Sequence, residues 1–287
     1  MEGNKPIVVG IGELLWDVLP TGKKAGGAPI NFVYHATQLG AEGYAISAVG
    51  KDELGEEIVQ ELDNNHIAHC NESVDYQTGK VEVTLEKGIP TYNIIENVAW
   101  DHIPVSSKAI EIVKKAKAIC FGTLAQRNMD SRKALTELLS YAPEDALRFF
   151  DINIRQNYYS KELILDLLEK ANILKINDEE LEMLRPMMGL GGDYEVCCKA
   201  LLEKYGLKYV ILTAGSKFSA IYSTDENSVI GTPKVAVADT VGAGDSFSGA
   251  FVYSILAGKS LKEAHRKAVN TAAFVCSKEG AWPEYSK

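Results

Sequence analysis

The seven residues Asp239-Thr240-Val241-Gly242-Ala243-Gly244-Asp245 are the most informative stretch of this chain. We expect a strand over residues 234–238 before them and a long apolar helix over residues 246–257 after them. Glycines at the mouth of a helix leave backbone N–H groups unpaired, with the positive end of the helix dipole behind them. The pattern therefore predicts an anion pocket, with the carboxylate of Asp245 in the first helical turn beside it.

A phosphate cradle beside a carboxylate that can accept a proton is what phosphoryl transfer to an alcohol requires. The alternative is a capped helix start in which Asp245 only complements the dipole, but this does not explain the two glycines. Two common phosphate motifs fail on specific residues. A Walker loop ending at Gly258-Lys259-Ser260 would need glycine at Tyr253, and a dinucleotide fingerprint would need glycine at Phe247.

A second glycine cluster, Gly26-Gly27-Ala28-Pro29-Ile30-Asn31, also opens an expected helix, over residues 28–39. Small residues let a ligand approach the backbone, and Asn31 offers a donor and an acceptor to a hydroxyl group. Asp17 follows the first expected strand, residues 7–11, and ligands of open α/β sheets bind beyond the carboxyl ends of strands. We expect Asp17 and Asn31 to face one polyol.

The composition limits the class of protein. The chain has 287 residues, 46% of them hydrophobic, which suits a single domain over residues 1–287. Its net charge of −9, from 30 basic and 39 acidic residues, argues against general nucleic-acid binding. Five cysteines without zinc spacing, no apolar signal core at the N-terminus and no membrane-length apolar run predict a cytoplasmic protein with reduced thiols.

Short apolar runs alternate with helical patterns along the chain, which predicts an α/β fold with a central, mostly parallel sheet and helices on both faces. The expected strands are residues 7–11, 45–49, 118–121, 147–150, 173–176 and 209–212, and the expected helices include 28–39, 55–64, 161–171 and 194–205. Residues 79–96 break this rhythm with alternating apolar residues around Gly88. This predicts an antiparallel hairpin that forms a lid over a cleft, a dimer contact or an ordinary edge of the sheet.

The two glycine clusters, in this order and spacing, resemble the two signatures of the ribokinase-like (PfkB-type) carbohydrate kinases, and the resemblance covers essentially the whole chain. The segments Gly12-Glu13-Leu14-Leu15-Trp16-Asp17 and Asp151-Ile152-Asn153-Ile154-Arg155 are most similar to the fructokinase branch. The resemblance implies an ATP-dependent sugar kinase that converts fructose to fructose 6-phosphate. Lids of this family often make dimers, so a homodimer through the lid is a further expectation.

The resemblance also implies roles for matching positions. Asp245 would be the base, and the backbone around Gly242, Ala243 and Gly244 would form the anion hole. Further expected roles fall into four groups: sugar binding by Asp17, Gly26, Gly27 and Asn31; nucleotide binding by Asn177, Thr213, Gly215, Asn270 and Ala273; Mg²⁺ held through water by Glu180; and a monovalent cation, K⁺, beside Asp239, Val241 and carbonyl groups near Cys276 and Gly280.

Two arginines outside the signatures are candidates for clamping a phosphate or a sugar group. Arg155 follows an expected strand, and Arg127 is the second candidate. The acceptor stays open between fructose, 2-keto-3-deoxygluconate, ribose and a nucleoside, and an acidic acceptor would use Arg155. A non-catalytic sugar or nucleotide sensor is the alternative of a different class, and Phe247 disfavours a dinucleotide-dependent oxidoreductase.

Overall fold

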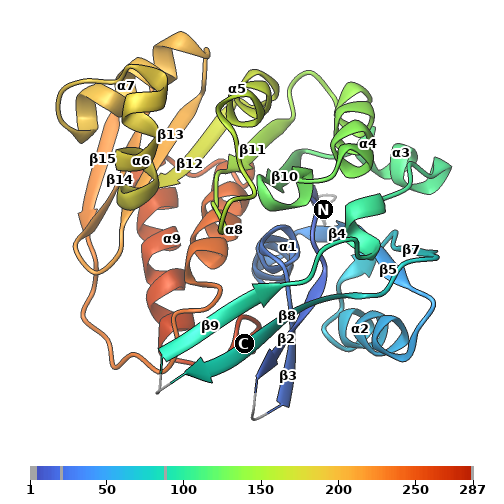
Figure 1. Ribbon diagram of the computed structural model, residues 1–287. Helices are drawn as coiled ribbons and strands as arrows, with labels where there is room; N and C mark the ends of the chain where they lie inside the picture. Colours follow the sequence, from blue (N-terminus) through green and yellow to red (C-terminus); the bar gives the residue numbers. More distant parts are fainter. Residues whose placement is uncertain (1–4, 20–21, 87–88, 286–287) are drawn as a thin grey trace.

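The computed structural model describes residues 5–19, 22–86 and 89–285, without the side chains of residues 83–92 (Figure 1). A nine-stranded sheet lies at its centre, in the order β15-β14-β13-β12-β11-β10-β1-β4-β6. Strands β13 to β6 run parallel, whereas β14 and β15 add an antiparallel edge. The bounds are β1 (Ile7–Ile11), β4 (Glu42–Ile46), β6 (Ala68–His69), β10 (Ala118–Gly122), β11 (Leu147–Asp151), β12 (Ile173–Asn177), β13 (Tyr209–Ala214), β14 (Phe218–Tyr222) and β15 (Asn227–Gly231).

Helices cover both faces of this sheet because its parallel strands are apolar on both sides. One apolar core joins the sheet to α3 (Ser107–Val113), α4 (Met129–Ser140), α5 (Lys161–Lys170), α6 (Asp178–Met188) and α7 (Tyr194–Lys204). A second core joins it to α1 (Ala28–Leu39), α2 (Glu53–Asn64), α8 (Ala243–Leu256) and α9 (Leu261–Cys276). Alternate strand residues supply the two cores, with Phe150 in the first and Phe149 in the second. The predicted fold class is confirmed.

A four-stranded sheet in the order β3-β2-β8-β9 lies beside the main sheet (Figure 1). Its strands are β2 (Leu15–Leu19), β3 (Gly22–Gly26), β8 (Gly79–Glu86) and β9 (Ile89–Ile94). The predicted hairpin is present as the antiparallel pair β8 and β9, while its turn, including Gly88, lies outside the described residues. The sequence reading missed that β2 and β3 complete this sheet, so the segment that carries Asp17 is itself part of it.

Two expected strands differ from the structure. Residues 234–238 form an exposed loop, which backbone hydrogen bonds from Ala238 and Asp239 tie to the Cys276 carbonyl. Its valines face solvent, so apolar alternation there does not signal a buried strand. The strand expected at residues 45–49 is divided at Ser47 between β4 and β5 (Ala48–Gly50), and β5 pairs with β7 (Glu72–Val74). Ser47 donates its hydroxyl to the Gly12 carbonyl at this break.

The remaining described elements are short 3₁₀ turns at Ala99–His102 and Leu124–Gln126. Within the described residues, no helix combines the length and apolar character needed to cross a membrane. The five cysteines are free thiols.

Candidate active site

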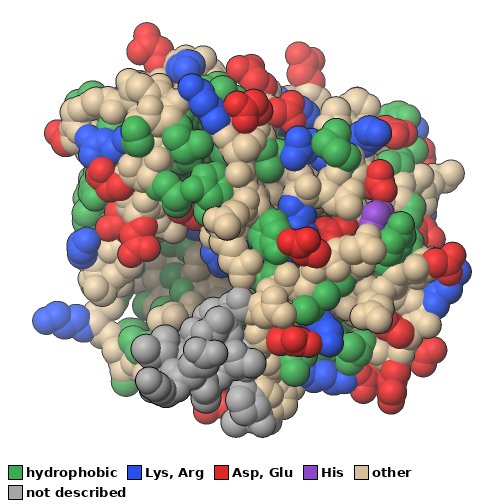
Figure 2. Space-filling model, viewed as in Figure 1, with side chains coloured by type: hydrophobic (Ala, Val, Ile, Leu, Met, Phe, Trp, Pro, Cys, Tyr) green, Lys and Arg blue, Asp and Glu red, His purple; other side chains and the backbone are tan. Residues whose placement is uncertain are grey.

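The first turns of α1 and α8 lie side by side at the centre of the molecule. Gly249, one turn after Asp245, makes this possible, because a Cβ there would come within 2.6 Å of the Phe32 carbonyl oxygen. The close approach of α1 and α8 at Gly249 brings Asn31 and Asp245, which are 214 residues apart in the chain, into hydrogen-bonding contact. Figure 2 shows the molecular surface hollowed in the region where Figure 1 places α8 and α9.

Asn31 connects Asp245 to a tryptophan. Its amide nitrogen donates to Oδ2 of Asp245 at 2.8 Å, and its amide oxygen accepts the indole N–H of Trp282 at 2.8 Å. The pKa of Asp245 is raised to about 6, chiefly by burial and next by the nearby Asp151, against the lowering effects of Asn31, Lys175 and Arg155. Asp245 thus keeps one carboxylate oxygen free of Asn31, and its basicity is greater than that of an ordinary aspartate.

The residues predicted to form an anion pocket lie at the start of α8. Gly242 is the N-cap residue with φ of 76°, and a Cβ on it would lie 2.9 Å from the Ala281 Cβ. Ala243 donates its N–H to the Thr240 carbonyl at 3.3 Å, and the first helical bond runs from Ser246 to Gly242. Within the described residues, the N–H groups of Gly244 and Asp245 have no backbone acceptor. The N–H of Gly242 likewise has no backbone acceptor, so among the described residues the N–H groups of Gly242, Gly244 and Asp245 are available to an anion, and that of Ala243 is not.

A buried ion pair lies beneath this pocket. The Lys175 ammonium donates to Oδ2 of Asp151 at 2.7 Å, and both side chains are almost fully buried. The ammonium lies 3.2 Å from the point where a Cβ on Gly244 would be, so glycine at 244 leaves it room. Burial alone would lower the pKa of Lys175, but Asp151, Glu180 and Asp245 raise it above its ordinary value. Lys175 is therefore a fixed positive charge beside the anion pocket.

Glu180 joins two strand ends near this pair. Its carboxylate accepts the backbone N–H groups of Asn177 and Ile154, and Asn177 in return caps the Glu180 N–H. This reciprocal capping fixes the start of α6. Each carboxylate oxygen keeps a lone pair, and the Asp151 Oδ1 nearby is buried without a hydrogen-bond partner. An oxygen without a partner, beside a second carboxylate, suits water molecules that surround a magnesium ion.

Of the residues predicted to bind the sugar, Asp17 and Gly26 lie on the small sheet, and Gly27 and Asn31 lie at the start of α1. Asp17 lies on β2, with its Oδ2 3.2 Å from the position of a Cβ on Gly26. The pKa of Asp17 is raised to about 6, mainly by burial, although the positive charge of Arg155 lowers this pKa. Gly27 has φ of 125°, and a Cβ on it would come within 2.0 Å of the Glu13 carbonyl oxygen. Glycine at 26 and 27 therefore keeps this part of the site open.

Arg155 acts electrostatically on three carboxylates of the site, namely Glu13, Asp17 and Asp245. Its side chain is exposed and donates a hydrogen bond to the Ile154 carbonyl at 3.0 Å. Among the residues that the structure describes, no carboxylate lies within ion-pair distance of it. Its guanidinium is thus available to a ligand.

Arg127 has a different role from the predicted clamp. It is almost fully buried, donates twice to the Asp101 carboxylate at 2.8 Å, and donates to the Ile95 carbonyl at 2.6 Å. Its guanidinium also lies 4.0 Å from the Trp100 ring centre. These contacts fix the end of β9 and use Nε and Nη2, while Nη1 is buried without a hydrogen-bond partner, so the side chain is held in the structure and is not exposed to a ligand as Arg155 is.

The residues predicted for the nucleotide lie in two places. Asn177 and Thr213 are register partners at the carboxyl ends of β12 and β13, and Gly215 follows in a turn with φ of 50°. Asn270 lies on α9 and lines a cavity of about 620 Å³ between β15 and α9, while Ala273 is half-buried one turn later. The structure therefore places Asn177, Thr213 and Gly215 together at the strand ends, and Asn270 and Ala273 separately on α9.

The residues predicted for a monovalent cation gather behind α8. The Asp239 carboxylate accepts the N–H groups of Val241 and Gly280 at 3.0 and 3.1 Å. The Cys276 carbonyl accepts the N–H groups of Ala238 and Asp239. The predicted residues Asp239, Val241, Cys276 and Gly280 thus form one cluster. Hydrogen bonds already occupy some of the lone pairs on the Asp239 carboxylate and the Cys276 carbonyl.

Sequence reasoning missed four residues that the structure places at this centre: Glu13, Asp151, Lys175 and Trp282. Lys175 stands inside the apolar strand 173–176 and Asp151 directly ends another, so charge within a buried strand was a usable signal. Glu13 is 2% exposed, and its Oε1 accepts the Ala28 N–H at 3.2 Å while its Oε2 is buried without a partner. Trp282 gave no local signal, because its partner lies 251 residues away.

The chain is similar to known carbohydrate kinases over nearly its full length. Residues 12–285 match the pfkB family of carbohydrate kinases. Fructokinase-1 of Oryza sativa subsp. japonica is 27% identical over 312 residues, covering 99% of this chain and 95% of the relative. The 5-dehydro-2-deoxygluconokinase 2 of Bacillus cereus is 27% identical over 269 residues, covering 89% and 81%.

A solved structure agrees with these sequence comparisons. The crystal structure of a sugar kinase from Pyrococcus horikoshii in complex with ATP is 26% identical, superposes with a TM-score of 0.80, and covers 96% of this chain and 94% of that one. The chain therefore belongs to the pfkB family of carbohydrate kinases and has the ribokinase-like fold.

Proposed function

We propose that this sugar kinase transfers the γ-phosphoryl group of ATP to a hydroxyl group of fructose, giving fructose 6-phosphate. The observation that carries the proposal is the placement of Asp245. Its carboxylate is held by Asn31 beside the available N–H groups at the start of α8, with the Lys175 ammonium next to them. A base, an anion pocket and a fixed cation at one point suit phosphoryl transfer.

Each group then has a defined task. The free oxygen of Asp245 accepts the proton of the acceptor hydroxyl as its oxygen bonds to phosphorus. The N–H groups of Gly242, Gly244 and Asp245 receive the charge on the transferred phosphoryl group, while the bond from Ala243 to Thr240 holds this turn in place. Asp17, Gly26, Gly27 and Asn31 orient the sugar, which places the hydroxyl in line.

The nucleotide is assigned to Asn177, Thr213, Gly215, Asn270 and Ala273. Glu180 and Asp151 would hold Mg²⁺ through water, and the bound ion would neutralise phosphate charge. The cluster of Asp239, Val241, Cys276 and Gly280 is assigned to K⁺. The ATP complex of the Pyrococcus horikoshii relative supports the nucleotide assignment.

A carboxylated sugar, such as 2-keto-3-deoxygluconate, is the second candidate acceptor. Arg155 favours it, because this exposed guanidinium faces the acceptor side without an ion-pair partner among the described residues. One relative is named for a deoxygluconate substrate and another for fructose, so both acceptor classes occur among similar chains. Fructose stays the first choice because of the two fructokinase-like segments around Asp17 and Arg155.

The deciding experiment measures kcat/KM for fructose, 2-keto-3-deoxygluconate and ribose in an assay coupled to ADP release, for the wild type and for Arg155→Met. We expect the highest value with fructose, and a loss of about tenfold or less in the variant, since a neutral sugar offers no charge to pair. A higher kcat/KM on the acid, with a loss of about 100-fold or more in the variant, would replace fructose by a carboxylated acceptor.

We further propose that residues 1–287 act as one domain in the cytoplasm and that the small sheet, with β8 and β9, covers the bound sugar. Both edge strands of this sheet, β3 and β9, are available for a homodimer. Sedimentation equilibrium distinguishes a dimer from a 31.3 kDa monomer.

A further inference from the structure

We propose that Trp282 is a positioning residue of the phosphoryl-transfer site, which sets the orientation of the Asn31 amide and thereby holds the catalytic carboxylate of Asp245. The proposal rests on the proposed role of Asp245 as the base. It concerns a side chain outside both glycine signatures, in the segment that follows α9.

The chemistry of the indole ring decides the orientation. Indole can only donate a hydrogen bond, so the atom of Asn31 that faces Trp282 must be the amide oxygen. The amide nitrogen must then face Asp245, where it donates to Oδ2 at 2.8 Å. In the flipped orientation, the amide oxygen would oppose the carboxylate and the amide nitrogen would oppose the indole N–H.

The same contacts leave capacity for the sugar. An asparagine side chain has two N–H donors and two lone pairs, and Trp282 and Asp245 use one of each. One donor and one lone pair remain for an acceptor hydroxyl. Asn31 can therefore bind the sugar and hold the base at the same time, provided that its amide does not rotate.

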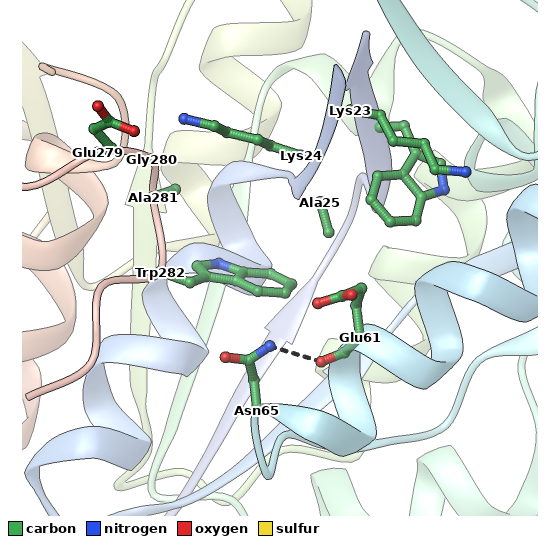
Figure 3. A pocket seen from close by; sticks show the side chains of 10 residues that line it. Lys23, Lys24, Ala25, Glu61, Asn65, Glu279, Gly280, Ala281 and Trp282 are labelled. Carbon is green, nitrogen blue, oxygen red and sulfur yellow. Dashed lines mark hydrogen bonds between the residues drawn. The ribbon is translucent and has the colours of Figure 1, made fainter. Parts of the chain in front are cut away.

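Trp282 is itself held firmly on one side. Its ring stacks on Tyr34 of α1 with centres 5.7 Å apart and an angle of 18°, and the Tyr34 hydroxyl donates to the Pro283 carbonyl. Figure 3 shows the ring between Lys24 and Ala25 of β3 and Asn65 at the end of α2, in a cavity of about 400 Å³. The ring thus links the small sheet, α1 and the segment after α9.

A purely structural role for Trp282 predicts lower stability and nothing more. A positioning role predicts a change in the titration of Asp245, whose other charged neighbours are Glu13 after β1, Asp151 on β11, Arg155 after β11 and Lys175 on β12. Asn31 is the neighbour that donates a hydrogen bond to the carboxylate, so its loss disfavours the ionised form. The acid limb of activity should then move to higher pH.

The test compares Trp282→Phe with Trp16→Phe. Both variants remove one indole N–H next to the same cavity, but that of Trp16 donates to the Leu54 carbonyl of α2 and not to Asn31. We expect Trp282→Phe to lower kcat about tenfold, the loss of one hydrogen bond, and to move the acid limb of kcat/KM upward by about half a pH unit. Trp16→Phe should keep the wild-type acid limb. An unchanged kcat and acid limb in a folded Trp282→Phe protein would overturn the proposal.

A second measurement uses the folded wild-type protein and does not depend on activity. The indole N–H signals of the three tryptophans are followed by nitrogen-15 NMR against pH, with Trp16→Phe and Trp100→Phe identifying the signal of Trp282. We expect that signal to titrate with a midpoint near 6, as Asp245 does, and to lose this titration in Asp245→Asn. A Trp282 signal that does not titrate, or whose titration is unchanged in Asp245→Asn, would overturn the proposal that Trp282 acts on Asp245 through Asn31. An active Asp245→Asn enzyme would instead overturn the assignment of Asp245 as the base.

Discussion

Asp245 combines three properties that are separate in most aspartates: it is the third residue of a helix, it receives a side-chain amide, and it lies near a buried lysine. The helix start attracts an anion, while burial makes the carboxylate a better proton acceptor. In the proposed mechanism, one side chain therefore stands where the acceptor hydroxyl and the transferred group meet.

Replacing Asp245 with Asn should lower kcat by about 10³-fold or more, because the amide keeps the shape but cannot accept the proton. The affinity for ATP, measured by calorimetry, should stay within about threefold of the wild type. Asp225→Asn, an exposed site between β14 and β15, is the matched control and should behave as wild type. Wild-type turnover in Asp245→Asn would support a binding protein or sensor without this base.

The pH dependence of activity follows from the pKa of Asp245, which is raised to about 6. The carboxyl group is protonated below that pH and cannot act as a base, so kcat/KM should fall about tenfold per pH unit below 6 and level off above 7. Initial rates between pH 5 and 8 measure this at saturating ATP. A flat profile over that range would contradict the assignment.

At the scale of elements, the contact between α1 and α8 sets the geometry of the site. Gly249 is the point of closest approach, since a Cβ there would lie 2.6 Å from the Phe32 carbonyl oxygen and 3.1 Å from the His35 Cβ. The helices must separate to admit even a methyl group. That movement would lengthen the hydrogen bond between Asn31 and Asp245.

Gly249→Ala should therefore lower kcat by about tenfold or more and reduce the melting temperature, although alanine favours a helix by about 1 kcal/mol over glycine. Kinetics and thermal unfolding measure the two effects. Gly191→Ala is the control, because a Cβ at that position meets nothing within 4 Å. A Gly249→Ala protein that is more stable and fully active would show that helix separation does not limit the site.

At the scale of the whole molecule, the site places several acidic groups in a buried region of a chain that is already acidic. Glu13, Asp17 and Asp245 all have raised pKa values, and that of Glu13 reaches about 7, mainly through burial. A raised carboxyl pKa stabilises the fold fully below the ordinary value of 4.5, and this contribution is lost as the pH rises through 7. The buried carboxylates of the site therefore lower the free energy of unfolding at neutral and alkaline pH.

Glu13→Gln should recover part of this stability, since the amide keeps an oxygen for the Ala28 N–H and carries no charge. We expect its melting temperature to exceed that of the wild type by roughly 5 °C at pH 8, with the difference disappearing near pH 4.5. Glu137→Gln on the exposed side of α4 serves as the control. A lower melting temperature of Glu13→Gln at pH 8 would mean that the Glu13 charge stabilises the fold.

Local patterns predicted the parts of this molecule that depend on neighbouring residues. The glycines around residue 243, the helix after them and the alternation of strands and helices all follow from backbone chemistry within a few residues. The strand expected at residues 234–238 was wrong because apolar alternation does not report burial, and the valines there face solvent. The hydrogen bonds of Asn31 could not be predicted, because they join three segments that only the complete topology brings together.

The position of Trp282 in the chain also has a consequence during synthesis. The ribosome adds this residue 251 positions after Asn31, when the strands of both sheets and all helices up to α9 have already been made. Domains can fold while their chains are still being translated. A chain that lacks residue 282 carries the residues of the anion pocket, but the amide of Asn31 lacks the partner that orients it. A chain that stops before residue 282 would thus be an impaired kinase, even though it carries both glycine clusters and Asp245.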